Sequence, residues 1–126
     1  MKRVIIACVL SILLIASCFI SYNYIDKTTS GLSEHLQKAA KAVDIHDFST
    51  AHKQMEKVYN HWSESSSLLS SLCRHNEIDD IERLFQRANQ AVLNKDKNDS
   101  LVQIKELNMM LLHLPEMETP CLSNIL

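Results

Sequence analysis

The chain has 126 residues, of which 13 are basic and 15 acidic, and its net charge of −2 is unsuited to nucleic-acid phosphates, which clustered lysine and arginine bind. Its length allows one domain, and its single glycine excludes the glycine-rich loops that bind nucleotide phosphates. With only two prolines as well, the chain has too few turn residues for a sandwich or barrel, so the composition predicts long helices in an all-α fold.

The first predicted element is an apolar helix that crosses a membrane. Residues Val4 to Ile25 carry no charge and would span roughly 33 Å as a helix, close to the ~30 Å hydrocarbon thickness of a bilayer. Two basic residues precede this segment and an aspartate follows it, so the positive-inside rule places the N-terminus in the cytoplasm. We therefore expect a membrane anchor in residues 1–25, inserted through residues 4–25, and an extracytoplasmic domain in residues 26–126 of a single-pass cell-membrane protein.

Two other interpretations of this segment stay open. Cys18 follows a branched residue and two small residues, as in a relaxed lipoprotein signal, but apolar residues come after it where a polar tether is usual. The third interpretation is ordinary cleavage with release of the domain, although no Ala-x-Ala motif follows the apolar run. All three export residues 26–126, and loss of palmitate label in Cys18→Ser would indicate the lipoprotein.

The remaining elements are helices, each marked by apolar residues at steps of three and four. We predict helices over about residues 3–43, 48–72, 77–93 and 98–114. They form an N-terminal transmembrane helix followed by a small antiparallel bundle of two helical hairpins. Gly31 costs ~1 kcal/mol inside a helix, which favours a bend in the first one without requiring it, so the continuity of this helix stays open. The stripes of the last three helices are Phe48, Ala51, Met55, Val58 and Trp62, then Ile78, Ile81, Phe85, Ala88 and Val92, then Leu101, Ile104, Leu107, Leu111 and Leu114.

Polar residues and a proline predict where these helices begin and end. Asp47 precedes the second helix and can cap its free backbone amides. Asn76 begins the segment Asn-Glu-Ile-Asp, which resembles a capping box at the start of the third helix. Residues 96–99 mark the turn into the fourth helix. Pro115 ends that helix at Leu114, because proline disfavours helical geometry in the preceding residue.

Two parts of the chain resemble each other at an offset of 49 residues. Residues 36–43 match residues 85–92, and the same offset pairs Asp47 with Asp96. Each copy consists of a helix, a short acidic turn and a second helix, which is similar to the hairpins of tetratricopeptide-type repeats. Two copies are fewer than the three or more that an open array needs, so we predict a closed bundle. Chance similarity between amphipathic helices stays open as an explanation of the match.

Six histidines raise the question of a metal site. None belongs to an HExxH motif, and no CxxC or CxxH pair is present. His75, Glu77 and Asp79 concentrate three metal-ligating side chains at a helix start, but acidic residues there also stabilise the helix dipole. We expect capping at this position, and no metal or cofactor site. The six histidines are His35, His46, His52, His61, His75 and His113.

Catalytic motifs are equally weak, and we expect no enzymatic activity and no catalytic residue. Six serines lie within residues 63–71 without a Gly-x-Ser-x-Gly nucleophile elbow, so they suit close helix packing or contact with water. Glu116 and Glu118 lie near His113 as a pair of acids, with no sequence feature that indicates a cleft. Trp62 falls on an apolar stripe, so we place it in the core rather than on a partner-binding surface.

Two further predictions concern the C-terminal part of the chain. Cys73 and Cys121 lie in the exported part, where oxidation permits a disulfide that ties the tail to the helices, and two free or partly buried thiols are the alternative. The tail, residues 116–126, ends in three apolar residues. We expect it to dock against the bundle, and a short linear motif for a partner is the alternative.

A set of short motifs follows the apolar anchor in a fixed order along nearly the whole chain. The motifs are Asp47-Phe48-x-x-Ala51, Trp62, His75-x-Glu77-Ile78-Asp79, Leu112-His113-Leu114-Pro115-Glu116 and Asn124-Ile125-Leu126. Together they resemble the bacterial domain-of-unknown-function family 4363 (DUF4363). The resemblance implies a small, single-anchor helical protein of Gram-positive bacteria with no assigned activity, and a lipoprotein signal is unusual in that family. Phe48 departs from the family, which often has tryptophan at this core position.

These features combine into one main hypothesis and two alternatives. We expect a non-enzymatic interaction module, held at the outer face of the membrane, that binds another membrane or envelope protein. The first alternative is a metal or small-ligand sensor that uses the bundle histidines. The second is a lipoprotein with a structural or chaperone-like role in the envelope. One dominant protein partner after mild crosslinking would indicate the main hypothesis, and a bound metal or small molecule would indicate the sensor.

Overall fold

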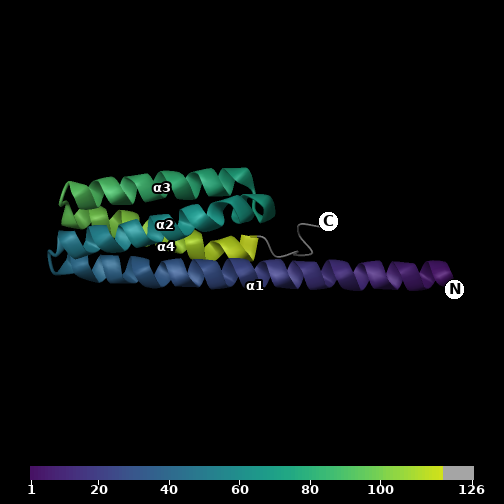
Figure 1. Cartoon of the computed structure of the whole chain (residues 1–126). Helices are drawn as coiled ribbons and strands as arrows, with labels where there is room; N and C mark the ends of the chain where they lie inside the picture. The colour runs from purple at the N-terminus through teal and green to yellow at the C-terminus, as the bar shows by residue number, and fades with distance from the viewer. Residues whose placement is uncertain (118–126) are drawn as a thin grey trace.

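The computed structural model describes residues 1–117, and four helices account for nearly all of them. They are α1 (Lys2–Asp44), α2 (Phe48–Leu72), α3 (His75–Leu93) and α4 (Lys97–Met117). The helices alternate in direction, so that α1 and α2 form one hairpin and α3 and α4 a second (Figure 1). The predicted all-α fold is confirmed.

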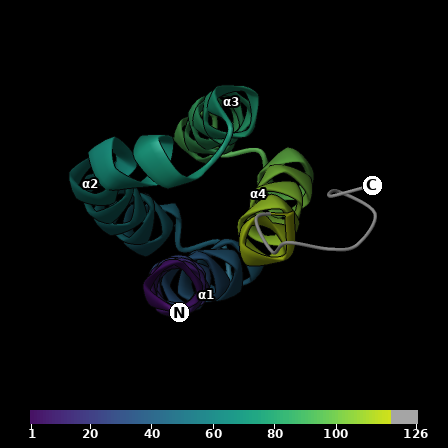
Figure 2. The ribbon, with the colours of Figure 1, turned by 90° about the vertical axis from the view of Figure 1, so that its right-hand side faces the viewer.

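The two hairpins pack side by side and close into a bundle. α1 packs against both α2 and α4, α4 packs against α3, and α2 packs more loosely against α3. Seen along the bundle, the four helices surround a common interior, with α1 beside α4 (Figure 2). The contact between the first and the last helix distinguishes this closed arrangement from an open repeat array, whose first and last helices stay apart.

A continuous apolar core fills the interior of the bundle. Trp62 is 1% exposed, which confirms its predicted place in the core, and it contacts Phe85 with ring centroids 5.7 Å apart. Positions that correspond at the 49-residue offset are buried together, as Met55 and Ile104 show. The predicted stripes of α2, α3 and α4 supply most of the core, and α1 adds Ile25, Leu32, Leu36, Ala39, Ala42 and Val43.

The turns inside the two hairpins have the same structure. His46 and Lys95 end α1 and α3 in the left-handed region, with φ of 60° and 56°. The next residue, Asp47 or Asp96, donates its backbone N–H to a carbonyl five residues earlier, at 2.8 and 3.2 Å, as in a Schellman motif. Each aspartate then accepts a hydrogen bond from the backbone N–H three residues later, at 3.1 Å in both turns. The sequence repeat therefore extends to the backbone hydrogen bonds of the turns.

The two halves of α1 differ in burial. Residues 1–20 are exposed throughout, whereas Ile25 is buried and begins the core. The first half of the helix projects beyond the ends of the other three helices, with the N-terminus at its far end (Figure 1). The bend that Gly31 favours does not occur, because α1 is one helix of 43 residues through this position. Gly31 faces α2, where a Cβ atom would meet His61 Cε1 at 3.6 Å, an ordinary packing distance.

Two predicted helix ends are wrong. α3 begins at His75 rather than after Asn76, because the connection from α2 consists of Cys73 and Arg74 alone and the Arg74 carbonyl accepts the first helical hydrogen bonds. α4 continues to Met117 with Pro115 inside it, beyond the predicted end at Leu114. Proline removes one hydrogen-bond donor, and this loss has not ended the helix within its last turn.

Candidate functional site

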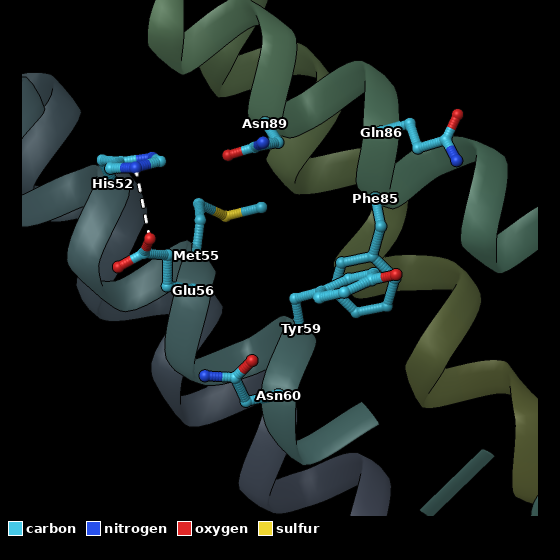
Figure 3. A pocket seen from close by; sticks show the side chains of 8 residues that line it. All are labelled: His52, Met55, Glu56, Tyr59, Asn60, Phe85, Gln86 and Asn89. Atoms are coloured by element: carbon cyan, nitrogen blue, oxygen red, sulfur yellow. Dashed lines mark ion pairs between the residues drawn. The ribbon is translucent and has the colours of Figure 1, made fainter. Parts of the chain in front are cut away.

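A groove lies between α2 and α3, the neighbouring helices that pack most loosely. Its volume is ≈ 440 Å³, within the range of about 300–1,000 Å³ that is typical of binding pockets. Figure 3 shows the side chains of both helices that line it. We call it the α2–α3 groove, and its residues are His52, Met55, Glu56, Tyr59, Asn60, Phe85, Gln86 and Asn89.

The floor of the α2–α3 groove is apolar and joined to the core. Met55 and Phe85 are buried there. Tyr59 lies over Phe85 in an edge-to-face arrangement, with ring centroids 6.2 Å apart, and is 52% exposed (Figure 3). Phe85 also contacts Trp62, so the exposed tyrosine ring packs against a pair of aromatic rings that the core holds in place. The groove thus presents a large, half-exposed ring on a rigid support.

The rim of the groove is polar. His52 Nε2 lies 3.5 Å from Glu56 Oε1, one helical turn away, so a protonated imidazole would form an ion pair there (Figure 3). His52 Nδ1 is buried without a hydrogen-bond partner in the structure. Asn60, Gln86 and Asn89 add amide groups from both helices. The rim therefore offers one carboxylate, one imidazole and three amide groups above an apolar floor.

A second hollow continues the groove towards the turns. It has a volume of ≈ 420 Å³ and shares His52 with the α2–α3 groove. Phe48 and Val92 supply apolar surface there, and Lys95 lies at its edge. The two hollows together extend from the middle of α2 and α3 to the end of the bundle that is farthest from the N-terminus (Figure 1).

The turn at this end holds a carboxylate whose pKa is shifted. Thr50 donates hydrogen bonds to Asp47 from its hydroxyl at 2.6 Å and from its backbone N–H at 3.1 Å. These two bonds hold the pKa of Asp47 below its ordinary value of 3.8, and the hydroxyl has the larger effect. The same hydrogen bonds stabilise the charged cap of α2, and neither of them indicates proton transfer to or from Asp47.

The six histidines are distributed over all four helices and the first turn, and His46 and His52 both line the second hollow. His35 Nδ1 lies 3.1 Å from Gln54 Oε1, His61 packs near Gly31, and His46 forms the first turn. His75 and His113 are exposed on α3 and α4. Over residues 1–117, no three His, Cys, Asp or Glu side chains come close enough to hold a metal ion. Of the six, His52 is the one that lines the groove.

The other sequence candidates whose side chains the structure describes also lie outside the groove. Ser66, Ser70 and Ser71 donate their hydroxyls to carbonyls of their own helix at 2.9–3.2 Å. Glu77 lies in the first turn of α3, where an acidic residue suits the helix dipole, but the N-cap is Arg74 rather than Asn76, so the predicted capping box is wrong. Cys73 is buried. The side chain of Glu116 and all of residues 118–126, with Glu118, Cys121 and the apolar tail, lie outside the described residues.

Sequence reasoning did not identify the α2–α3 groove, although α2 carries a signal for it. The buried stripe of α2 runs through Met55, Val58 and Trp62, but His52 and Tyr59 lie beside this stripe at helical spacing. A tyrosine and a histidine at the edge of an apolar face indicate a surface that is partly covered. The position of α3, which turns this edge into a groove, depends on the tertiary fold.

The fold defines a class of protein, a small four-helix bundle that continues from a long N-terminal helix. This helix is long and apolar enough to cross a membrane, and none of the 18 residues in its most apolar segment is buried. The chain belongs to the family "Domain of unknown function (DUF4363)", whose sequence profile matches residues 19–125. The family resemblance predicted from the motifs is confirmed. Among curated proteins and solved structures, nothing matches the chain.

Proposed function

We propose that the protein is a single-pass membrane protein whose bundle lies outside the cytoplasm and binds a segment of another membrane or envelope protein in the α2–α3 groove, without catalysis. The observation that carries the proposal is the half-exposed Tyr59 ring, in edge-to-face contact with Phe85 within the groove. Tyrosine is enriched among the residues that dominate binding energy at protein interfaces.

Membrane attachment is supported by the uncovered half of α1. A soluble protein rarely exposes a contiguous apolar surface as large as that of Val4 to Ile20, whereas the hydrocarbon layer of a membrane favours contact with such a surface. Lys2 and Arg3 precede the apolar run, which favours a cytoplasmic N-terminus and supports an outer position of the bundle. Such an anchor confines the groove to a layer close to the membrane, where partners held in the same membrane are concentrated.

The chemistry of the groove indicates the kind of segment that it would bind. Met55, Tyr59 and Phe85 suit one or two apolar side chains of a partner, and methionine adapts its shape to different occupants. The amide groups of the rim suit the polar backbone or side chains of the same segment. An amphipathic segment with an apolar anchor residue fits both parts.

A photocrosslinking amino acid at Gln86 in the full-length protein tests this proposal in intact cells. Gln86 is exposed at the rim, and the matched control is the same amino acid at Met109, which is exposed on α4 outside the groove. We expect one dominant protein adduct from position 86 and none of that size from position 109. Tyr59→Ala should abolish the adduct, and Tyr59→Phe, which keeps the ring, should retain it. Equal adducts from both positions would contradict the proposal.

One observation favours a second candidate function, the binding of a small ligand. The buried, unpartnered His52 Nδ1 is a group that a ligand in the groove could satisfy. A metal ion or small molecule that copurifies with the intact protein, and is lost in His52→Ala but not in His75→Ala, would support this candidate over the protein partner.

The lipoprotein alternative concerns Cys18, whose thiol is exposed on α1. Processing there would remove residues 1–17 and leave a lipid on the remaining part of the helix. Palmitate labelling of the wild-type chain and of Cys18→Ser tests it, with Cys8→Ser as the matched control, because Cys8 is an exposed cysteine on the same helix. We expect no label in any of the three. Label that disappears with Cys18 alone would replace the transmembrane anchor by a lipid anchor.

A further inference from the structure

We propose that the C-terminal end of α2, residues 65–73, lies in the headgroup layer of the membrane, so that the bundle rests directly on the lipid surface. We call these residues the membrane-facing end of α2. The proposal deepens the proposed function, on whose membrane anchor it rests. It assigns a second membrane contact to the protein, made by the bundle itself.

The position of the membrane-facing end along α1 is the first argument. Leu72 lines a small hollow together with Cys18, Tyr22 and Ile25 of α1. The end of α2 is therefore level with the part of α1 that closes the uncharged segment Val4–Ile25. Because α1 continues as one helix through these residues, there is no linker that could lift the bundle away from the membrane.

The length of the uncovered helix is the second argument. The exposed apolar run from Val4 to Ile20 is roughly 25 Å long as a helix, whereas the hydrocarbon layer of a bilayer is about 30 Å thick. The hydrocarbon layer therefore extends to the residues just after Ile20, and the α1 residues that line the hollow with Leu72, from Ser17 to Ile25, lie on both sides of this level. This places the membrane-facing end of α2 at the boundary between hydrocarbon and headgroups.

The chemistry of the membrane-facing end is the third argument. Residues 65–73 carry no charge, between Glu64 and Arg74. Leu68 is 49% exposed, an apolar side chain that water does not favour. The hydroxyls of Ser66, Ser70 and Ser71 are hydrogen-bonded within α2, so they need little from the surrounding medium. An uncharged surface with internally satisfied polar groups suits a lipid interface better than bulk water.

A fluorescent reporter on single introduced cysteines tests the proposal in the full-length protein, reconstituted in vesicles of phosphatidylglycerol and phosphatidylcholine. The four native cysteines are replaced, and the reporter is attached at Leu68→Cys or, as a second position on the same end, at Ser71→Cys. The matched control is Leu93→Cys, because Leu93 is 51% exposed at the opposite end of the bundle. Leu13→Cys, on the uncovered half of α1, reports on the anchor. Circular dichroism confirms that each labelled variant is helical.

We expect lipids with a headgroup nitroxide to quench the reporters at positions 68 and 71 several-fold more than the reporter at position 93, and aqueous iodide to quench them less. If acyl-chain nitroxides quench position 13 while positions 68 and 71 are quenched no more than position 93, the result supports the membrane anchor and refutes the second membrane contact. If position 13 is itself open to iodide, the membrane anchor fails, and this inference fails with it.

Discussion

The α1–α2 hairpin and the α3–α4 hairpin have equivalent turns but different lengths. Both turns combine a left-handed residue, a Schellman hydrogen bond and an aspartate cap, yet α1 has 43 residues and α3 has 19. The elements that both hairpins share, the turn and the helical segments on either side of it, form the bundle. The unshared part is the first half of α1, which has no counterpart in the second hairpin. The bundle is therefore encoded in the segments that the two hairpins share, and the apolar helix that is long enough to cross a membrane precedes them.

The two hairpins also differ where they meet. The first contributes Leu36 and Trp62 to the core, and the equivalent positions in the second hold Phe85 and Leu111. Each hairpin thus supplies one buried aromatic ring, and the two rings contact each other where α2 meets α3. The hairpins are complementary in shape rather than interchangeable, although their turns are equivalent.

Truncation of the core at equivalent positions has the largest expected effect. We expect Trp62→Ala to lower the free energy of unfolding by about 3–5 kcal/mol and Leu111→Ala by about 2–5 kcal/mol, because both side chains are buried and leave cavities. Denaturant unfolding of the full-length protein in detergent measures both. A loss below ~1 kcal/mol for Trp62→Ala would show that the contact between the hairpins is not closely packed.

The two aspartate caps provide a smaller and more symmetrical test. Asp47→Ala and Asp96→Ala should each lower the thermal midpoint by roughly 3–6 °C, because both side chains accept the same backbone hydrogen bond. Asp44→Ala is the control, since its exposed ion pair with Lys97, at 3.6 Å, contributes little. A loss confined to one cap would mean that the turns are equivalent in geometry but not in energy.

Glycine at a left-handed position, His46 or Lys95, is expected to raise the stability of the fold. Lys95→Gly should raise the free energy of unfolding by up to ~1 kcal/mol, because glycine adopts positive φ without the steric penalty of a side chain. Lys57→Gly, at an exposed position within α2, should lower it by about 1 kcal/mol. If His46→Gly does not raise the free energy of unfolding as Lys95→Gly does, the ring contact between His46 and Phe48, with centroids 6.3 Å apart, stabilises the first turn.

The pH dependence of the first cap is the smallest expected effect. The folded pKa of Asp47 is lower than its ordinary value of 3.8, so the unfolded chain binds the proton more readily as the pH falls. The charged cap therefore stabilises the fold above about pH 4, and this contribution is lost as the pH falls through the folded pKa. The difference in thermal midpoint between the wild type and Asp47→Ala should narrow below about pH 4. A difference that stays constant down to pH 2 would contradict the assigned hydrogen bonds.

Apolar periodicity and caps were sufficient to predict much of this fold. The bounds of α2 were predicted correctly because Asp47 caps one end and the helical spacing that begins with the stripe continues through Leu69 to Leu72 at the other. The start of α3 was missed because a two-residue connection, which is a tertiary constraint, outweighed the preference of Asn76 for a cap position. The α2–α3 groove was missed because a stripe shows which residues are buried and does not show which neighbouring helices leave space between them.

The central claim is that the uncovered half of α1 crosses the lipid and leaves the bundle outside the cytoplasm. An epitope tag after Leu126, with protease added to intact cells, tests it most directly, and the same tag before Met1 serves as the control. We predict that protease removes the C-terminal tag while the N-terminal tag remains protected until the cells are lysed. A C-terminal tag that survives until lysis would contradict the claim.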